Sequence, residues 1–301
     1  MKQNNIERRV LLRGGVGLAA LSGLGALTGC GLVGGSAAAG AGGGAGDKTI
    51  KLIATESAPF QEPSKIATKI LKEQGWDLQI RYVTDIVQPN QAVDRGEYDA
   101  NYFQHGAYLS QFNKDNNLNI EMSFYVYSSP AGLFSKNVKK IEDLPQGAKI
   151  ALPVDPANNG RGLRLLAQAG LLEVDESKSV IHLSQRDIKS NPRNFTFVEV
   201  DQQSLASTFP DVDAGFLFVR LAGELGFTPA TALAFETTEQ SLPYIVGVSG
   251  KPGFSETEKG KALKAAYQSP EVREWFKSYI GGALGTPWDR NPAEDQKKWD
   301  I

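Results

Sequence analysis

The chain is poor in the residues that most often carry chemistry. It has one cysteine, Cys30, and two histidines, His105 and His182, in 301 residues. One cysteine excludes a disulfide within the chain, and neither histidine belongs to a zinc-ligand spacing, so we predict no metal site. A Gly-x-Ser-x-Gly nucleophile motif is missing too, because 247–250 (Gly-Val-Ser-Gly) is one residue short of it. We therefore predict a protein that is not an enzyme and that needs no cofactor.

A strong net charge and a long hydrophobic run are also missing. The 32 Lys and Arg nearly balance the 34 Asp and Glu, which gives a formal net charge of −2. A mildly acidic chain offers no basic surface for nucleic acid, so we expect no nucleic-acid partner. The uncharged stretch 14–27 is rich in glycine and shorter than the roughly 20 apolar residues that a membrane-spanning helix needs.

Residues 1–29 have the layout of a signal peptide. Basic residues between Lys2 and Arg13 precede the uncharged stretch, which ends in Leu-Thr-Gly-Cys30. The Arg8-Arg9 pair fits a twin-arginine export signal as well as an ordinary basic start, and both remain open. Leu-x-Gly-Cys in this position resembles a lipobox, so we predict that Cys30 is acylated, for example with palmitate. The chain would then be a lipoprotein anchored to the cell membrane, facing its extracytoplasmic side, with the Gly/Ala-rich residues 30–47 as a flexible tether.

Strand-like and helix-like segments alternate after this tether. Apolar, β-branched runs predict strands at 49–54, 78–83, 98–103, 149–152, 195–200, 214–220 and 243–248. Helical spacing of apolar residues falls between them and over 256–280. The strand–helix–strand order predicts an α/β fold with largely parallel sheets.

This order divides the chain into two α/β units. One unit comprises 48–126 with 245–301, because the C-terminal helices have no sheet of their own and should pack back on the first unit. The other comprises 127–244. The chain would cross between the units twice, near 125–130 and 242–248, which predicts a hinged ligand cleft between two lobes.

Two segments could form a ligand site in that cleft. Residues 98–112 contain five aromatics, and Tyr102, Phe103, His105 and Tyr108 could enclose an apolar or thioether group. The alternative is that these aromatics form a core face. Residues 155–161 (Asp-Pro-Ala-Asn-Asn-Gly-Arg) predict a helix start at which Asn159 and Arg161 could bind a carboxylate. The alternative there is an arginine on a solvated helix face.

These two segments, with 87–90 (Val-x-Pro-Asn) and 143–149 (Asp-Leu-Pro-x-Gly-Ala-Lys), resemble the NlpA-type methionine-binding lipoproteins. Members of that family are the substrate-binding components of methionine ABC importers. The likeness is collinear from about residue 48 to residue 290. It implies a two-lobed type II periplasmic-binding fold, a ligand buried between the lobes, and an ABC permease and ATPase as partners. A surface lipoprotein that acts as a sensor or adhesin on the same fold is the alternative.

The resemblance also assigns roles to single residues and shows departures. It implies that Tyr102, Phe103, His105 and Tyr108 surround the ligand side chain and that Arg161 binds its carboxylate. Asparagines are expected for the ligand's polar head, yet Phe218, Arg220 and Val246 stand at or beside those positions. Losing two hydrogen bonds, at about 1.5–3 kcal/mol each, would weaken methionine binding by roughly two to four orders of magnitude. We therefore predict a divergent member for methionine or a related amino-acid-like ligand, with Arg220 as a possible second contact for an anion.

Overall fold

The computed structural model describes residues 47–179, 181–299 and 301. The predicted signal peptide, the lipidation site Cys30 and nearly all of the tether lie outside these residues. Within them, no helix has the length and apolar character to cross a membrane. The same residues hold no group of three or more His, Cys, Asp or Glu side chains that could bind a metal ion.

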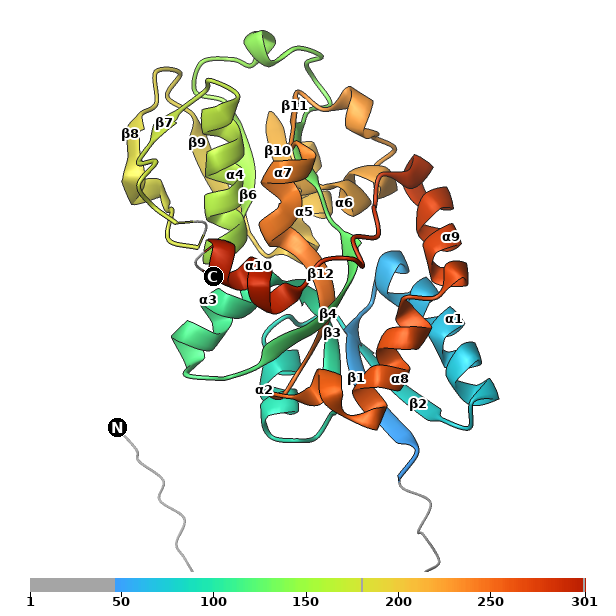
Figure 1. The fold of residues 1–301 in the computed structure, drawn as a ribbon. Coiled ribbons are helices and arrows are strands. Elements are labelled where there is room, and N and C mark those ends of the chain that lie inside the picture. The colour runs from blue at the N-terminus through green and yellow to red at the C-terminus, as the bar shows by residue number, and fades with distance from the viewer. Residues whose placement is uncertain (1–46, 180, 300) are drawn as a thin grey trace, which may run out of the picture. The chain divides into compact units, whose positions relative to one another are not determined.

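The strands form two five-stranded sheets (Figure 1). In order across it, the first sheet contains β2 (Asp77–Val83), β1 (Thr49–Thr55), β3 (Ala100–His105), β12 (Ile245–Gly250) and β4 (Glu121–Ser128). The second contains β11 (Ala234–Phe235), β5 (Ala131–Phe134), β10 (Ala214–Phe218), β6 (Lys149–Pro153) and β9 (Thr196–Val200). We call the parts built on these sheets lobe 1 and lobe 2. The chain passes to lobe 2 between β4 and β5 and returns between β11 and β12.

The sheets are mixed rather than largely parallel. β1 runs parallel to β2 and β3, and β6 runs parallel to β9 and β10. β12 is antiparallel to β3 and β4, and β5 is antiparallel to β10 and β11. The antiparallel pairs involve β5 and β12, the strands that directly follow the two crossings between the lobes. Each of these strands enters its sheet from the other lobe and is therefore not joined to its neighbour by the crossover helix that a parallel pair requires.

Lobe 1 is completed by helices from both ends of the chain. These are α1 (Ala58–Glu73), α2 (Gln88–Asp94), α3 (Gly106–Asn116), α8 (Glu258–Tyr267), α9 (Pro270–Ser278) and α10 (Pro292–Trp299). Helices α8 and α9 of the C-terminal part contact α1 of the first unit. The helical spacing predicted over 256–280 is divided between two helices, since α8 ends at Tyr267 and α9 begins at Pro270 with Ser269 as its cap. Proline suits a first turn but cannot continue a helix.

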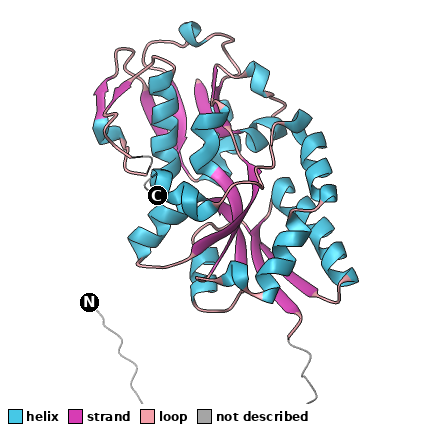
Figure 2. Ribbon diagram, in the orientation of Figure 1, coloured by secondary structure: helices cyan, strands magenta, loops and turns pink. Residues whose placement is uncertain are grey.

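Lobe 2 surrounds its sheet with one long helix, α4, and several short elements (Figure 2). They are α4 (Pro156–Gln168), α5 (Leu205–Thr208), α6 (Val219–Glu224), α7 (Thr238–Ser241) and the small strands β7 (Glu173–Val174) and β8 (Ile188–Ser190). Asp155 caps α4 by accepting a hydrogen bond from the backbone of Asn158. The predicted strand at 214–220 ends at Phe218, because Val219 and Arg220 already belong to α6.

Candidate ligand-binding site

The aromatic side chains of β3 and α3 point to two different places. Tyr102 lies in the core of lobe 1, where its hydroxyl donates to the Pro59 carbonyl at 2.9 Å and its ring packs edge-on against Phe60. Phe103 and Tyr108 instead pack with Ala157 of α4, which belongs to lobe 2. Successive strand residues face opposite sides of a sheet, so Tyr102 and Phe103 cannot line the same surface. Phe103 and Tyr108 therefore lie where the lobes meet, whereas Tyr102 is surrounded by core residues.

His105, at the end of β3, joins the two lobes by a hydrogen bond. Its Nδ1 accepts the backbone N–H of Tyr108 at 3.0 Å, and its Nε2 lies 3.0 Å from Oδ1 of Asn158 in α4. The imidazole is thus neutral, with its proton on Nε2. Burial and, to a smaller extent, the positive charge of Arg161 lower the pKa of His105 to about 3. The neutral ring is therefore the form that holds the lobes together.

Asn158 extends this link into the start of α4. Its amide nitrogen donates to both carboxylate oxygens of Asp155, at 3.0 and 3.2 Å. Burial raises the pKa of Asp155 to about 6, and the hydrogen bonds from Asn158 oppose that rise. The neighbouring Asn159 faces lobe 2 instead, because its amide donates to Pro153 at 2.9 Å and to Glu199 at 2.7 Å. A role for Asn159 in ligand binding stays a prediction.

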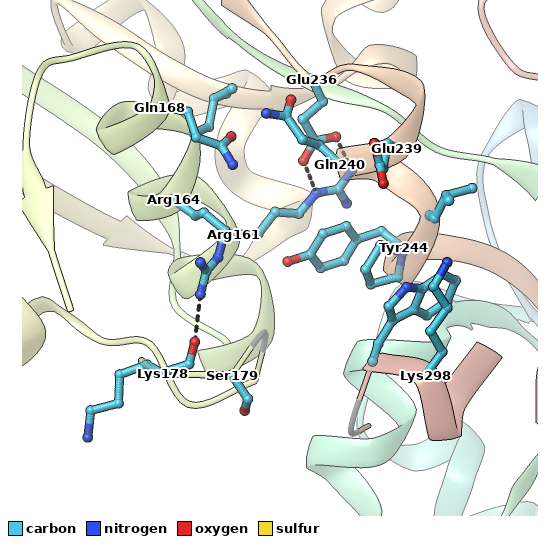
Figure 3. A pocket seen from close by; sticks show the side chains of 14 residues that line it. Arg161, Arg164, Gln168, Lys178, Ser179, Glu236, Glu239, Gln240, Tyr244 and Lys298 are labelled. Carbon is cyan, nitrogen blue, oxygen red and sulfur yellow. Dashed lines mark hydrogen bonds and ion pairs between the residues drawn. The ribbon is translucent and has the colours of Figure 1, made fainter. Parts of the chain in front are cut away.

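Arg161 is buried, 2% exposed, and its charge is already compensated. Nε donates to Oε1 of Glu236 at 2.6 Å, and Nη2 donates to Oε2 of Glu236 at 2.5 Å (Figure 3). Nη2 also donates to the Ser129 carbonyl at 2.7 Å. Nη1 is enclosed and has no partner in the described part of the chain. The fork that would hold a ligand carboxylate is thus occupied by the protein's own carboxylate. Sequence reasoning missed Glu236, because 75 residues separate it from Arg161 and no motif marks it.

A series of neighbouring aromatic rings and guanidinium groups leads from His105 in lobe 1 into lobe 2. The rings of His105 and Tyr244 meet edge-on with centroids 5.1 Å apart, and the guanidinium carbon of Arg161 lies 3.8 Å from the centre of the Tyr244 ring. The Phe218 ring follows, with the guanidinium carbons of Arg161 and Arg220 each 5.7 Å from its centre. We call these five residues the interlobe series. It brings together four of the predicted site residues, His105, Arg161, Phe218 and Arg220, and adds Tyr244.

A cavity of about 400 Å³ opens beside Arg161. Its lining comes from α4, from the segment between Glu236 and Tyr244, and from the end of α10 (Figure 3). Arg164 on this lining is engaged as well, donating to the Lys178 carbonyl at 3.0 Å and pairing with Glu176 at 3.4 Å. The volume is in the range of small-molecule sites.

The model of the family described as NlpA lipoprotein matches residues 52–287. The chain belongs to this family. It is similar to the methionine-binding lipoprotein MetQ of Bacillus subtilis (strain 168), with 34% identity over 244 residues that cover 80% of this chain and 88% of that protein. The D-methionine-binding lipoprotein MetQ of Escherichia coli (strain K12) is 30% identical, with 76% of this chain and 84% of that protein covered. These relatives confirm the resemblance drawn from the sequence.

Solved structures confirm the two-lobed fold. A nutrient-binding protein from Burkholderia cenocepacia, bound to methionine, has a TM-score of 0.74 and 33% identity over 79% of this chain and 99% of its own. Lipoprotein Tp32 from Treponema pallidum has a TM-score of 0.75 and 29% identity over 80% and 99%.

Of the three residues at or beside the positions where the resemblance leads us to expect asparagine, Phe218 and Val246 are apolar and the third is Arg220. Phe218 is 3% exposed and its ring packs edge-on against Phe216, with centroids 5.7 Å apart. Val246 is 4% exposed in β12, the strand that comes directly after the return crossing. Neither side chain can donate or accept a hydrogen bond, so neither can hold a polar ligand head.

Proposed function

We propose that the protein is a solute-binding lipoprotein that captures methionine or a related amino-acid-like molecule between its lobes. It then delivers this ligand to the permease and ATPase of an ABC importer. The observation that carries the proposal is the interlobe series, in which aromatic and cationic side chains from both lobes meet at one place. Such a site exists only when the lobes are closed, which is how a binding protein encloses its ligand. Membership of the NlpA lipoprotein family and the methionine-bound structural neighbour support the ligand class.

The proposed contacts depend on the geometry of this junction. Phe103 and Tyr108 offer apolar surface between the lobes, where a thioether or alkyl side chain could pack. Arg161 offers only Nη1, because Glu236 and Ser129 take its other donors. One remaining donor and no free charge make Arg161 a weaker carboxylate ligand than an unpaired arginine would be. Methionine should therefore bind less tightly than to a site with an unpaired arginine and two asparagines.

Titration calorimetry of the purified lipoprotein in detergent with L- and D-methionine tests the ligand class. We expect saturable binding weaker than micromolar, because two hydrogen-bonding side chains are replaced by Phe218 and Val246. Micromolar or tighter binding of either enantiomer would show that the replacements do not matter. In the double variant Arg161→Met/Glu236→Gln, which removes the ion pair and leaves no buried charge, affinity should fall about tenfold through the loss of one charge-assisted donor. Unchanged affinity would refute the placement of Arg161 in the site.

Binding without conversion and membrane anchoring are parts of the same proposal. Ligand recovered after prolonged incubation should be chemically unchanged by NMR, and a time-dependent product would refute a purely binding role.

Cys30 would anchor the chain to the cell membrane through acyl chains, with the folded part on the extracytoplasmic side. Uptake of labelled ligand by cells lacking the gene should fall, and normal uptake would favour the sensor or adhesin alternative.

A further inference from the structure

The helix α10 lies after the part of the chain that matches the family, since that match ends at residue 287. α10 contacts β4 and α3, and so belongs to lobe 1. Just before it, Nε1 of Trp288 donates to the Val126 carbonyl of β4 at 2.7 Å. Asp295, which is buried in α10, accepts a hydrogen bond from Nε of Arg290 at 2.7 Å. The chain thus adds a firmly held helix to lobe 1 beyond the residues that the family model matches.

The end of α10 forms one wall of the cavity beside Arg161. Lys298 and Trp299 line this cavity together with α4 of lobe 2 and the segment from Glu236 to Tyr244 (Figure 3). No side chain of β3 or α3 lines it. The cavity is therefore distinct from the junction at which Phe103 and Tyr108 meet α4, and its walls come from both lobes.

The hydroxyl of Tyr244 lies on this lining without a hydrogen-bond partner among residues 47–179, 181–299 and 301. Tyr244 is 3% exposed, and its oxygen is not among the fully enclosed atoms that lack a partner. Figure 3 shows the hydroxyl pointing toward α4, across the cavity. Burial raises the pKa of Tyr244, so the hydroxyl keeps its proton and can donate. A buried donor without a partner is costly, which favours a ligand that brings an acceptor to this place.

The charges around the cavity favour an anionic acceptor. Arg161 and Glu236 on its wall neutralise each other. The other charged residues of the lining are three cations and one anion: Arg164, Lys178, Lys298 and Glu239. Arg164 and Lys178 pair with carboxylates outside the lining at 3.4 and 3.5 Å, which is longer than a strong hydrogen bond. An excess of positive charge favours a carboxylate over a neutral acceptor.

The remaining walls of the cavity are apolar. They come from Leu165 of α4, from Leu242 and Pro243, and from Trp299 of α10. Trp299 is half-buried, and the guanidinium carbon of Arg290 lies 5.5 Å from the centre of its ring. Aromatic rings offer a large surface to an apolar group. The volume of about 400 Å³ lies near the lower end of the range for small-molecule sites, so the cavity suits a compact apolar body.

We propose that this cavity is a second small-molecule site, which binds a carboxylic acid with a compact apolar body. The Tyr244 hydroxyl donates to the carboxylate, the surrounding cations attract it, and Trp299 covers the apolar body. This site goes beyond the proposed function, because its ligand does not touch Phe103 and Tyr108. The chain has the site because α10 supplies a wall that lies outside the family match.

Calorimetry of the purified lipoprotein in detergent with 3-phenylpropionate and 3-phenylpropan-1-ol, which share one apolar body, tests the head group. We expect the acid to bind at least about tenfold more tightly than the alcohol. Tyr244→Phe keeps the ring and removes the donor, so it should weaken the acid about tenfold. The matched control is Tyr127→Phe, which removes the hydroxyl of another buried tyrosine in β4, outside the cavity, and should bind the acid like the wild type.

Substitution of Trp299 tests the wall that α10 supplies. Trp299→Ala should weaken the acid at least about tenfold, and Trp299→Phe should weaken it less, because a ring remains. The matched control is Trp275→Ala, which removes a half-buried tryptophan of α9 that stacks on Tyr279 at 4.6 Å outside the cavity. This control should bind the acid like the wild type. L-Methionine should still bind when the acid saturates its site.

The outcomes separate this inference from the proposed function. An acid that does not bind, that binds no more tightly than the alcohol, or that keeps its affinity in either Tyr244→Phe or Trp299→Ala overturns the second site. Competition between the acid and methionine also overturns it, because the two would then share one site. Absence of methionine binding, with the acid bound as expected, overturns the proposed function alone. If Trp299→Ala does not fold, judged by circular dichroism, Trp299→Phe and the preference of the wild type for the acid decide in the same way.

Discussion

The guanidinium of Arg161 and the carboxylate of Glu236 form a two-point ion pair inside lobe 2, with donor–acceptor distances of 2.6 and 2.5 Å. Their side chains are 1% and 4% exposed, so water screens neither charge. Glu236 also accepts the backbone N–H of Ala131 at 2.8 Å, where the chain enters lobe 2. The attraction within such a buried pair adds little to the free energy of folding, because removing both charges from water is costly. Removing one partner is nevertheless strongly destabilising, because it leaves the other charge buried without a counterion.

Replacing Glu236 by glutamine should strongly destabilise the protein. The substitution keeps the shape of the side chain but leaves the Arg161 guanidinium buried without a counterion, which costs about 3–5 kcal/mol. Urea unfolding followed by circular dichroism measures the change. Glu62→Gln, which breaks the exposed pair between Glu62 and Lys65 at 2.6 Å, is the control and should leave the unfolding midpoint unchanged. Equal effects of the two substitutions would show that burial of the Arg161 pair does not matter.

The pH dependence of stability should contain two opposing contributions from the link between the lobes. The pKa of His105 falls from 6.5 to about 3 on folding, so its contribution is complete above pH 6.5 and is lost as the pH falls toward 3. The pKa of Asp155 rises from 3.8 to about 6, so its contribution is complete below pH 3.8 and is lost as the pH rises through 6. Between about pH 4 and pH 6 the two slopes, each at most about 1.4 kcal/mol per pH unit, oppose each other.

Single substitutions should separate these slopes. Relative to wild type, His105→Gln should lose stability as the pH rises from about 4 to 6, because only the Asp155 contribution remains. Asp155→Asn, which retains a good helix cap, should lose stability as the pH falls over the same range. Urea unfolding at several pH values measures both profiles. Parallel profiles for the two variants would contradict the opposite pKa shifts.

Phe218→Asn should improve methionine binding at the expense of stability. The amide would restore a hydrogen bond to the polar ligand head, worth about 1.5–3 kcal/mol or roughly a ten- to hundredfold gain in affinity. Loss of a buried phenyl ring should lower the free energy of unfolding by about 3–5 kcal/mol. Phe216→Asn on the same strand is the control, with a similar loss of stability and no gain in affinity. If Phe218→Asn binds methionine no better than Phe216→Asn, then Phe218 does not determine the affinity.

Cys30→Ala should release the protein from the membrane, because the acyl chains are its predicted attachment. Cell fractionation should find the wild-type chain with the membrane and the variant in the soluble extracytoplasmic fraction. The melting temperature should not change, since the substitution leaves residues 47–179, 181–299 and 301 unaltered. Persistence of the variant in the membrane fraction would refute the lipidation prediction.

Local patterns in the sequence predicted much of this protein. Apolar alternation and helical spacing indicated the two α/β units, because each strand and helix buries a face that its own residues define. The antiparallel return of β12 was not anticipated, since strand direction depends on the elements that pack beside a strand. The segments around His105 and Arg161, to which the family resemblance assigns the ligand site, lie at the junction of the lobes, and their role in binding stays a prediction.

What the sequence by itself determined is therefore the class of fold, the family and the segments that meet between the lobes. Only the tertiary structure decided which charges in those segments are free. Glu236 lies 75 residues from Arg161 and Asn158 lies 53 residues from His105, and no spacing rule pairs residues so far apart. Compensation of a buried charge depends on distances of a few ångströms, and those distances exist only in the folded chain. The structure thus compensates Arg161 internally, whereas the buried Arg220 has no ion pair with a carboxylate of the described residues.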